Sequence, residues 1–314
     1  MRKGRFKILI ISIAVIISSC GSNGSKKEKI SISGAFALYP LTVKWAEIYM
    51  KENPSVQIDI SAGGAGKGMT DVLSGMVDLA MMSREIEPLE TEKGAFRIAV
   101  AKDAVVCVFN SLNPYTKEIL KHGIDSSSLA KIFITGELTL WSELGISSSK
   151  KEEIHLFTRS DACGAAAMWA SYLGKKQEDL KGTGVFGDPG IADAVKNDIL
   201  GLGYNNIVFL FDAQTGKKNS GLEILPIDLN ANGKIDSAEN FYHSIDRLTD
   251  AIKEGKYPSP PARHLYLVTN GKPEKTAVIN FLKWILTSGQ KYIEEAGYVK
   301  LPDDKLQAEL VKIQ

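Results

Sequence analysis

Hydrophobic and polar residues alternate along the chain in short stretches, and amphipathic stretches of helical length separate them. Residues 29–33 and 56–60 alternate apolar with polar side chains, which is typical of half-buried strands. Residues 41–52, between them, repeat apolar side chains at helical spacing, as does a stretch around Met69. Residues 78–82 form a mainly apolar run. This order predicts an α/β fold with mostly parallel sheets flanked by helices.

The second half of the chain follows the same order. The patterns at residues 154–158 and 265–268 predict strands, and those at 164–173, 189–197 and 274–286 predict helices. A second α/β unit is therefore expected.

No linker divides the chain into two sequential halves. The best crossing points are residues 104–110 and the proline-rich segment 258–261. Two crossings predict one lobe built from residues 29–105 and 263–314 and another built from residues 106–262. A cleft between such lobes is a natural place for a ligand.

The N-terminus has the plan of a secretory signal. Basic residues within positions 2–7 precede an apolar run at 8–17, and small residues lead to Cys20. The run is far shorter than the roughly 20 residues that span a bilayer. We expect a signal peptide over residues 1–19 and a flexible tether over 20–28. The spacing resembles a bacterial lipobox, which implies an exported lipoprotein, anchored to the membrane through Cys20 on the periplasmic side. An ordinary signal peptide with an incidental cysteine is the alternative.

Charge and composition exclude some functions. The 314 residues are 44% hydrophobic and 24% charged, as in ordinary globular proteins. The 38 Lys and Arg residues nearly balance the 37 Asp and Glu residues, so no global field favours nucleic acid or an anionic membrane. We expect a monomer that binds no nucleic acid.

Three glycine-containing turns lie between a predicted strand and a predicted helix, at residues 33–37, 63–68 and 159–165. Each directs free backbone N–H groups of a helix N-terminus at whatever lies there, which favours an anion. One such turn is weak support, because glycine also serves ordinary tight turns. Three in the same context predict a binding site for a small oxyanion.

Arg159 is the charged residue expected to bind that anion. It follows a predicted strand, and its rigid fork of donors suits a tetrahedral oxyanion, with Asp161 fixing its orientation. Ser83 and Arg84, at the end of the strand over 78–82, are a second candidate pair. The alternatives are a surface ion pair at Arg159 and a turn with a solvated Arg84.

These motifs resemble the phosphate-binding proteins of ABC transporters, in the type II periplasmic-binding-protein family. The resemblance covers the mature chain and rests on the segments 34–45, 62–84, 132–141, 159–164, 187–190 and 201–204. It implies a two-lobed fold with a hinged cleft, capture of phosphate or a similar oxyanion for an ABC permease, and no catalysis. The residues that it places at the ligand are Phe36, Ala37, Ala65, Gly66, Ser83, Arg84, Arg159, Asp161, Cys163, Gly164 and Ala165.

Four of these positions depart from the family pattern. Phe36, Ala65, Cys163 and Ala165 stand where the family usually carries Ser or Thr hydroxyls that donate to phosphate. A hydrogen bond to a charged group contributes roughly 1.5–3 kcal/mol, so several losses lower the phosphate affinity by decades. A different oxyanion or an organic phosphate-like ligand is the alternative to phosphate.

A separate motif over residues 228–239 fits the calcium-loop pattern D-x-[DN]-x-[DN]-G-x5-E in full. The expected ligands are Asp228, Asn230, Asn232, the carbonyl of Lys234, Asp236 and Glu239. With three carboxylates the Ca²⁺ site would be weak and structural, in the ~10⁻⁴–10⁻³ M range of extracellular modules. The alternative is a turn held by its own Asx hydrogen bonds. No catalytic cofactor is expected.

Two other functions stay open. Cys163 begins a predicted helix near Arg159, where a lowered pKa suits a nucleophile, but no histidine stands in a partner motif. A sensor or surface protein that binds a partner is the other alternative. Cys107 lies in an apolar run and is expected to be a small core residue, and nothing in the sequence requires a disulfide with Cys163.

Overall fold

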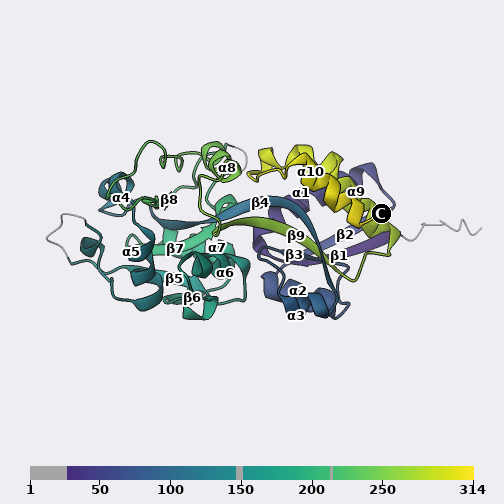
Figure 1. Ribbon diagram of the computed structural model, residues 1–314, viewed down its shortest axis with the longest axis horizontal. Helices are drawn as coiled ribbons and strands as arrows, with labels where there is room; N and C mark the ends of the chain where they lie inside the picture. The colour runs from purple at the N-terminus through teal and green to yellow at the C-terminus, as the bar shows by residue number, and fades with distance from the viewer. Residues whose placement is uncertain (1–26, 146–150, 213–214) are drawn as a thin grey trace, which may run out of the picture.

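The computed structural model describes residues 27–145, 151–212 and 215–314. The expected signal peptide and Cys20 lie outside the described residues. The described chain forms an elongated molecule with two halves (Figure 1).

Nine strands form one continuous sheet in the described part of the chain. Their bounds are β1 Glu28–Gly34, β2 Val56–Ala62, β3 Leu79–Met82, β4 Ala95–Asn110, β5 His155–Arg159, β6 Thr183–Val185, β7 Gly201–Asn206, β8 Leu222–Ile224 and β9 Ala262–Asn270. Their order across the sheet is β2-β1-β3-β9-β4-β7-β5-β6, with β8 also paired to β4. β1 begins at Glu28, inside the segment expected to be a tether.

Helices cover both sides of this sheet (Figure 1). Their bounds are α1 Tyr39–Glu52, α2 Ala65–Leu73, α3 Pro88–Glu92, α4 Thr116–His122, α5 Ser126–Ala130, α6 Gly164–Tyr172, α7 Gly187–Lys196, α8 Ile245–Lys253, α9 Thr276–Leu286 and α10 Asp303–Lys312. A short 3-10 helix, η1 (Phe36–Leu38), leads from β1 into α1. The helices predicted at residues 41–52, 164–173, 189–197 and 274–286 are confirmed within a few residues at their ends.

The sheet is parallel towards its two edges and antiparallel in its middle. β1 pairs in parallel with β2 and β3, and β5 pairs in parallel with β6 and β7. β4 and β9 are antiparallel to each other and to their other neighbours. β4 carries the chain out of the first half and β9 brings it back, so the two run in opposite directions. Hydrophobic periodicity predicted the parallel units but carries no information about the direction of crossing strands.

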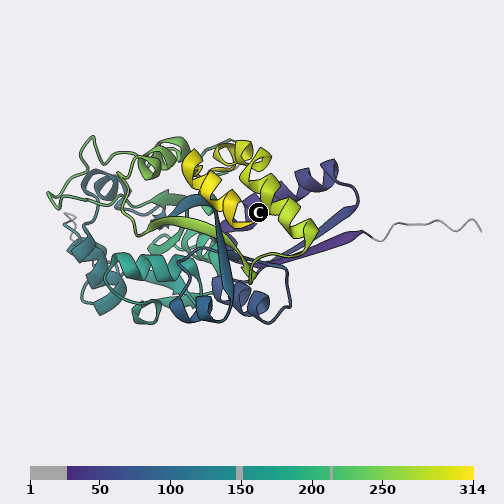
Figure 2. The same cartoon turned by 45° about the vertical axis from the view of Figure 1, so that its right-hand side comes forward.

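The buried side chains form two hydrophobic cores. The first draws on residues 30–101 and 265–313, and we call this half lobe 1. The second draws on residues 104–262, with Val299, and we call this half lobe 2. β4 and β9 run from one lobe to the other in both views (Figures 1 and 2). On β4 the core changes just before residue 104, slightly earlier than the predicted boundary.

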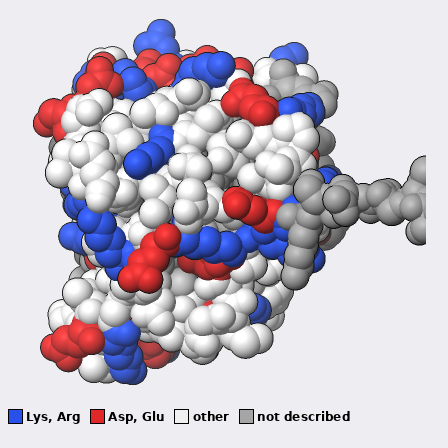
Figure 3. Space-filling model, turned by 90° about the vertical axis from the view of Figure 1, so that its right-hand side faces the viewer, with Lys and Arg blue, Asp and Glu red and all other residues white. Residues whose placement is uncertain are grey.

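Acidic and basic side chains are mixed on the surface of lobe 1. On the face shown in Figure 3, Lys and Arg side chains lie among Asp and Glu side chains. This mixing follows the near balance of charges in the sequence. Within the three described ranges, no helix is both long and apolar enough to cross a membrane.

Trp45 anchors the core of lobe 1. It is fully buried, and its indole Nε1 donates to the carbonyl of Gly289 at 2.8 Å. Trp45→Ala leaves a cavity and an unpaired carbonyl, so we expect the free energy of unfolding to fall by about 3–5 kcal/mol. Urea denaturation followed by circular dichroism measures this change. Met76→Ala, at a side chain that is 74% exposed, is the control and should change it by less than about 0.5 kcal/mol. Equal losses in the two variants would contradict the role of Trp45.

Candidate functional site

The three glycine-containing turns lie together where the two lobes meet. The amide of Gly66, in lobe 1, donates to the carbonyl of Ala162, in lobe 2, at 3.0 Å. The ring of Phe36, in lobe 1, packs edge to face on the ring of Phe186, in lobe 2, with centroids 5.8 Å apart. The turns that the sequence placed in separate strand–helix units therefore meet at one place.

Glycine permits the closest of these approaches. Gly164 opens α6 and faces Ser83, just beyond β3, so closely that a Cβ atom on Gly164 would overlap the carbonyl and hydroxyl oxygens of Ser83. Gly34, with φ of 131°, ends β1 against the backbone of Met81. The amide of Ala35 donates to the carbonyl of Met81 at 2.8 Å, which fixes the first turn on β3.

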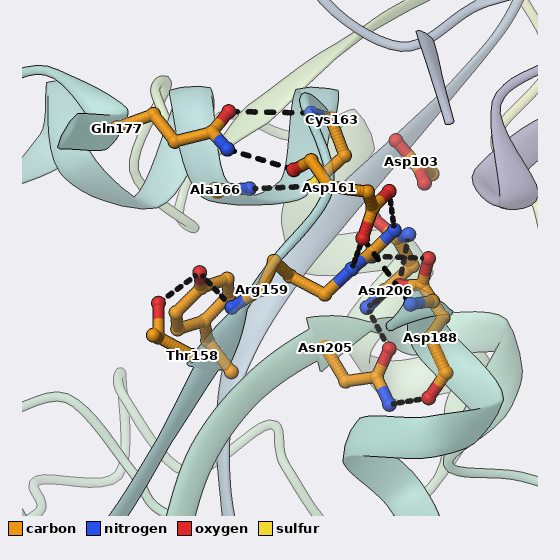
Figure 4. Close-up of polar contacts among 12 residues, drawn as sticks. Asp103, Thr158, Arg159, Asp161, Cys163, Ala166, Gln177, Asp188, Asn205 and Asn206 are labelled. Carbon is orange, nitrogen blue, oxygen red and sulfur yellow. Dashed lines mark hydrogen bonds and ion pairs between the residues drawn. The ribbon is translucent and has the colours of Figure 1, made fainter. Parts of the chain in front are cut away.

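Arg159 lies at the centre of the contact, at the end of β5. Its side chain is 1% exposed. Nε and Nη2 donate to the two carboxylate oxygens of Asp161 at 2.7 and 2.6 Å, and Nη1 donates to Asp188 at 2.6 Å (Figure 4). The guanidinium carbon lies 5.6 Å from the centre of the Phe36 ring, so lobe 1 covers the charge. The Arg159–Asp161 pair is thus buried, unlike the surface ion pair considered as the alternative.

Asp188 is a carboxylate to which the sequence assigned no role. It lies in the first turn of α7 and is buried. Its Oδ1 accepts hydrogen bonds from the backbone and side-chain amides of Asn206, the former at 3.3 Å. The side-chain amide of Asn205 donates to the carbonyl of Asp188 at 2.9 Å. Two signals marked Asp188: it directly precedes a predicted helix, where carboxylates are favoured, and it lies in the segment 187–190 of the family resemblance.

A second buried ion pair joins the two strands that cross between the lobes. Asp103 on β4 is opposite Arg263 on β9, and Oδ1 and Nε lie 3.2 Å apart. Nη2 of Arg263 also donates to the side chain of Asn206. Asp103 therefore connects through Arg263, Asn206 and Asp188 to Arg159. Figure 4 shows Asp103, Asn206 and Asp188 near Arg159. The sequence missed Asp103 and Arg263, because both sit in runs that predict ordinary strands.

Burial shifts the ionisation of this network. Burial raises the pKa of Asp103 to about 6, against the effect of the Arg263 guanidinium. Burial likewise raises the pKa of Asp188, although Arg159 opposes the shift. Burial alone lowers the pKa of Arg159, but the Asp188 and Asp161 carboxylates outweigh it and raise that pKa. Arg159 thus stays charged, and the two aspartates hold protons more readily than free aspartates do.

Cys163 is the N-cap of α6 and is buried. Its Sγ accepts from the amide of Ala166 at 3.4 Å, and its own amide donates to the side chain of Gln177 at 3.2 Å. Burial raises the pKa of the thiol to about 12, and the nearby Arg159 guanidinium does not reverse that shift. The thiol is therefore neutral at physiological pH, which disfavours the nucleophile considered from the sequence.

The other predicted ligand residues divide into two groups. Ala37, Ala65 and Ala165 are buried near the starts of η1, α2 and α6. Arg84 instead donates to both carboxylate oxygens of Glu90, at 2.9 and 2.7 Å, beside the start of α3. The structure therefore brings the alanines to the three turns and turns Arg84 towards its own lobe. Arg84 is thus held in an ion pair with Glu90 and differs from the solvated arginine considered as the alternative.

The predicted calcium loop follows β8 and is held by its own hydrogen bonds. Oδ2 of Asp228 accepts from the amide of Gly233 at 2.7 Å, and Oε1 of Glu239 accepts from the amide of Leu229 at 2.8 Å. The two loop asparagines donate to Asp236 at 3.0 and 2.8 Å. In the described segments, no group of three His, Cys, Asp or Glu side chains is placed to hold a metal ion. The loop thus has the Asx arrangement, and metal binding stays a prediction.

Known proteins share both sequence and fold with this chain. Residues 21–288 match the model of the PBP superfamily domain. The phosphate-binding protein PstS of Methanocaldococcus jannaschii is 27% identical over 94% of this chain and 89% of the relative. The phosphate-binding protein PstS of Bacillus subtilis is 25% identical over 98% of this chain and 97% of the relative.

Solved structures extend the likeness to the fold. A Clostridium perfringens protein whose crystal structure contains bound phosphate has a TM-score of 0.72 at 20% identity, covering 88% of this chain and 100% of that chain. An ABC-type phosphate transport receptor from Vibrio cholerae has a TM-score of 0.63 at 19% identity, covering 87% and 100%. At these identities the likeness concerns the fold alone.

Gly164→Ala tests the contact between the lobes. The added Cβ overlaps Ser83 across the interface, so we expect the lobes to separate while each lobe stays folded. Small-angle X-ray scattering should show a larger radius of gyration, with unchanged circular dichroism. Gly184→Ala is the control, because its Cβ meets only Ser160 of the same lobe, at 3.3 Å. An unchanged radius for Gly164→Ala would show that this contact does not hold the lobes together.

Proposed function

Because the chain belongs to the PBP superfamily, we propose that it is an extracytoplasmic solute-binding protein that captures a small oxyanion, with phosphate as the first candidate, for ABC-type uptake. Its two-lobed α/β architecture confirms the type II periplasmic-binding fold predicted from the sequence. The names of its relatives from Methanocaldococcus jannaschii and Bacillus subtilis support phosphate as the ligand.

The observation that carries the proposal is the convergence of helix N-termini from both lobes on the buried Arg159. α2 begins at Ala65 in lobe 1 and α6 begins at Gly164 in lobe 2. The first-turn N–H groups of each helix have no acceptor within the helix. The Gly66 amide donates to Ala162 and the Ala166 amide to Cys163 Sγ, so the other first-turn amides are the candidate donors to a ligand. Such groups on both sides of one guanidinium suit a small oxyanion. A ligand held from both sides favours closure of the lobes.

Binding rather than catalysis fits the chemistry of the site. Capture of an anion needs donors and a cation but no nucleophile. Cys163 carries a neutral thiol, and His155 pairs with Asp198 at 2.7 Å, at the far end of β5 from Arg159. We therefore propose that the chain is not an enzyme.

The partners follow from the transport role. The proposed partner is a membrane permease of the ABC type, which would receive the anion from the closed protein. Residues 8–17 and Cys20 support export and a lipid anchor on the periplasmic side. In this proposal the protein acts as a monomer, since one chain supplies both walls of the site.

A second candidate ligand is a different oxyanion or a phosphate-like molecule, bound by a sensor or surface protein. The side chains of Phe36, Ala65, Cys163 and Ala165 offer no hydroxyl at the three turns. The Phe36 ring instead lies over Arg159. Backbone N–H groups are then the main donors, and they do not distinguish phosphate from anions of similar shape.

Ala165→Ser tests whether the ligand is phosphate. If phosphate lies at the start of α6, the added hydroxyl donates to it, and we expect binding to tighten about tenfold or more. Isothermal titration calorimetry with inorganic phosphate measures the dissociation constant. Ala167→Ser, on the same helix, is the control and should bind as the unaltered protein does.

Sulfate and a phosphonate are titrated in parallel. Binding of sulfate or the phosphonate, with no detectable phosphate binding, would overturn phosphate as the ligand but would leave the anion site at Arg159 in place. Equal effects of the two serine variants would remove Ala165 from the ligand-binding residues.

We also propose that residues 228–239 bind calcium as a structural ion. The full motif match and the burial of Asp228 and Glu239 support this. Millimolar calcium is expected to raise the melting temperature by a few degrees and EGTA to reverse the rise, with phosphate affinity unchanged. Asp228→Asn should abolish the rise, while the exposed Asp250→Asn should keep it. A melting temperature that does not change with calcium would leave the Asx turn as the correct interpretation.

A further inference from the structure

The ionised groups of the site do not balance. Two guanidinium groups and three carboxylates form one connected buried network across β4, β5, α7, β7 and β9. They are Arg159, Arg263, Asp103, Asp161 and Asp188. With every group ionised, the network carries one net negative charge. This is an unusual environment for an anion, since like charges at short range in a buried site repel strongly.

The geometry identifies Asp188 as the surplus carboxylate. Asp161 binds Arg159 with both of its oxygens, which compensates that guanidinium in full. Arg263 is compensated by its cross-strand partner Asp103 through a single hydrogen bond, from Nη2 to Oδ2 at 3.2 Å, with Nε and Oδ1 also 3.2 Å apart. Asp188 shares Arg159 with Asp161, and its other oxygen is bound only by the neutral amides of Asn206. No guanidinium is left for Asp188 alone.

The remaining neighbours do not supply the missing positive charge. The titratable groups that face the network are Cys163 at the N-cap of α6, Tyr204 from β7, Tyr257 before β9 and Tyr298 from the C-terminal segment. Burial raises the pKa of each of these groups, so all four stay neutral near physiological pH. In the described ranges, no lysine and no third arginine forms an ion pair with the network.

We propose that Asp188 sets the charge that this site accepts, so that an oxyanion binds as a net monoanion and a dianion binds only together with a proton. The inference rests on the proposed function, because it concerns the anion bound beside Arg159. The proton resides either on the bound anion or on the carboxylates around Asp188. In both cases the complex gains one negative charge and no more.

The ionisation of the network agrees with this arrangement. Burial has already raised the pKa of Asp103 to about 6 and has raised that of Asp188. An anion bound beside them disfavours their ionised forms further and raises both pKa values again. Protons therefore enter when the anion binds. The affinity rises as pH falls towards about 6 and levels off below the pKa values of the unliganded network.

Proton counting tests the proposal on the unaltered protein. Isothermal titration calorimetry with inorganic phosphate is performed in two buffers of different ionisation enthalpy, at about pH 8 and at about pH 5, which lies below the pKa of Asp103. We expect uptake of close to one proton per phosphate at the higher pH, where phosphate is mainly a dianion, and close to none at the lower pH. Zero uptake at the higher pH with proton release at the lower pH would mean that the dianion binds alone, and would overturn the proposal.

Asp188→Asn removes the surplus charge. We expect this variant to lose the proton uptake at about pH 8 and to bind phosphate about tenfold more tightly there. Asp193→Asn is the matched control, because it makes the same change at an exposed position of the same helix and should leave both quantities unchanged. Circular dichroism reports the folding of both variants. If Asp188→Asn does not fold, the number of protons taken up per phosphate by the unaltered protein still tests the proposal.

The outcomes separate this inference from the proposed function. No binding of phosphate, sulfate or a phosphonate at either pH would overturn the proposed function and this inference together. Binding with the same proton count in the unaltered protein and in Asp188→Asn would overturn the role of Asp188 alone.

Discussion

The burial of one guanidinium is the constraint on which the rest of the site depends. Moving Arg159 out of water costs several kcal/mol, and only close partners with good geometry offset that cost. Asp161 supplies a two-point partner from the neighbouring loop, and Asp188 supplies a second partner from α7. The ends of β5, α7 and β7 are therefore fixed relative to one another. Removing either carboxylate would leave the remaining charges poorly matched in a place that water does not reach.

The same network ties the site to the strands that connect the lobes. Asp103 and Arg263 form a cross-strand pair where β4 and β9 pass from one core to the other, and Asn206 links that pair to Asp188. A rotation of the lobes about these strands would act on groups that also contact Arg159 through Asp188. The lobe contact and the charge network therefore respond to the same movement, although the two cores are separate.

The sequence predicted the local parts of this arrangement and missed the parts that depend on sheet order. Arg159 and Asp161 are two residues apart in one turn, so their pairing was visible, as was the strand–turn–helix context of all three turns. Asp188, Asn206, Asp103 and Arg263 come from four other elements. They meet because β7 lies between β4 and β5 and β9 lies beside β4. No periodicity or spacing encodes that order. Arg84, a charge near a turn, was expected at the ligand, and the structure pairs it with Glu90 within lobe 1.

In a site of this kind, the groups that attract the anion differ from the groups that set the net charge of the site. Backbone N–H groups attract an anion through fixed dipoles. They carry no net charge, so they do not alter the net charge of the site. Phe36, Ala65, Cys163 and Ala165 offer no hydroxyl at the turns, which leaves most of that attraction to the helix N-termini. The ionised network then acts mainly against excess charge, because its single surplus carboxylate repels whatever the dipoles attract. Shape selects the anion, and the carboxylates select its protonation state. This division explains why a chain without the expected hydroxyls still surrounds Arg159 with two acids.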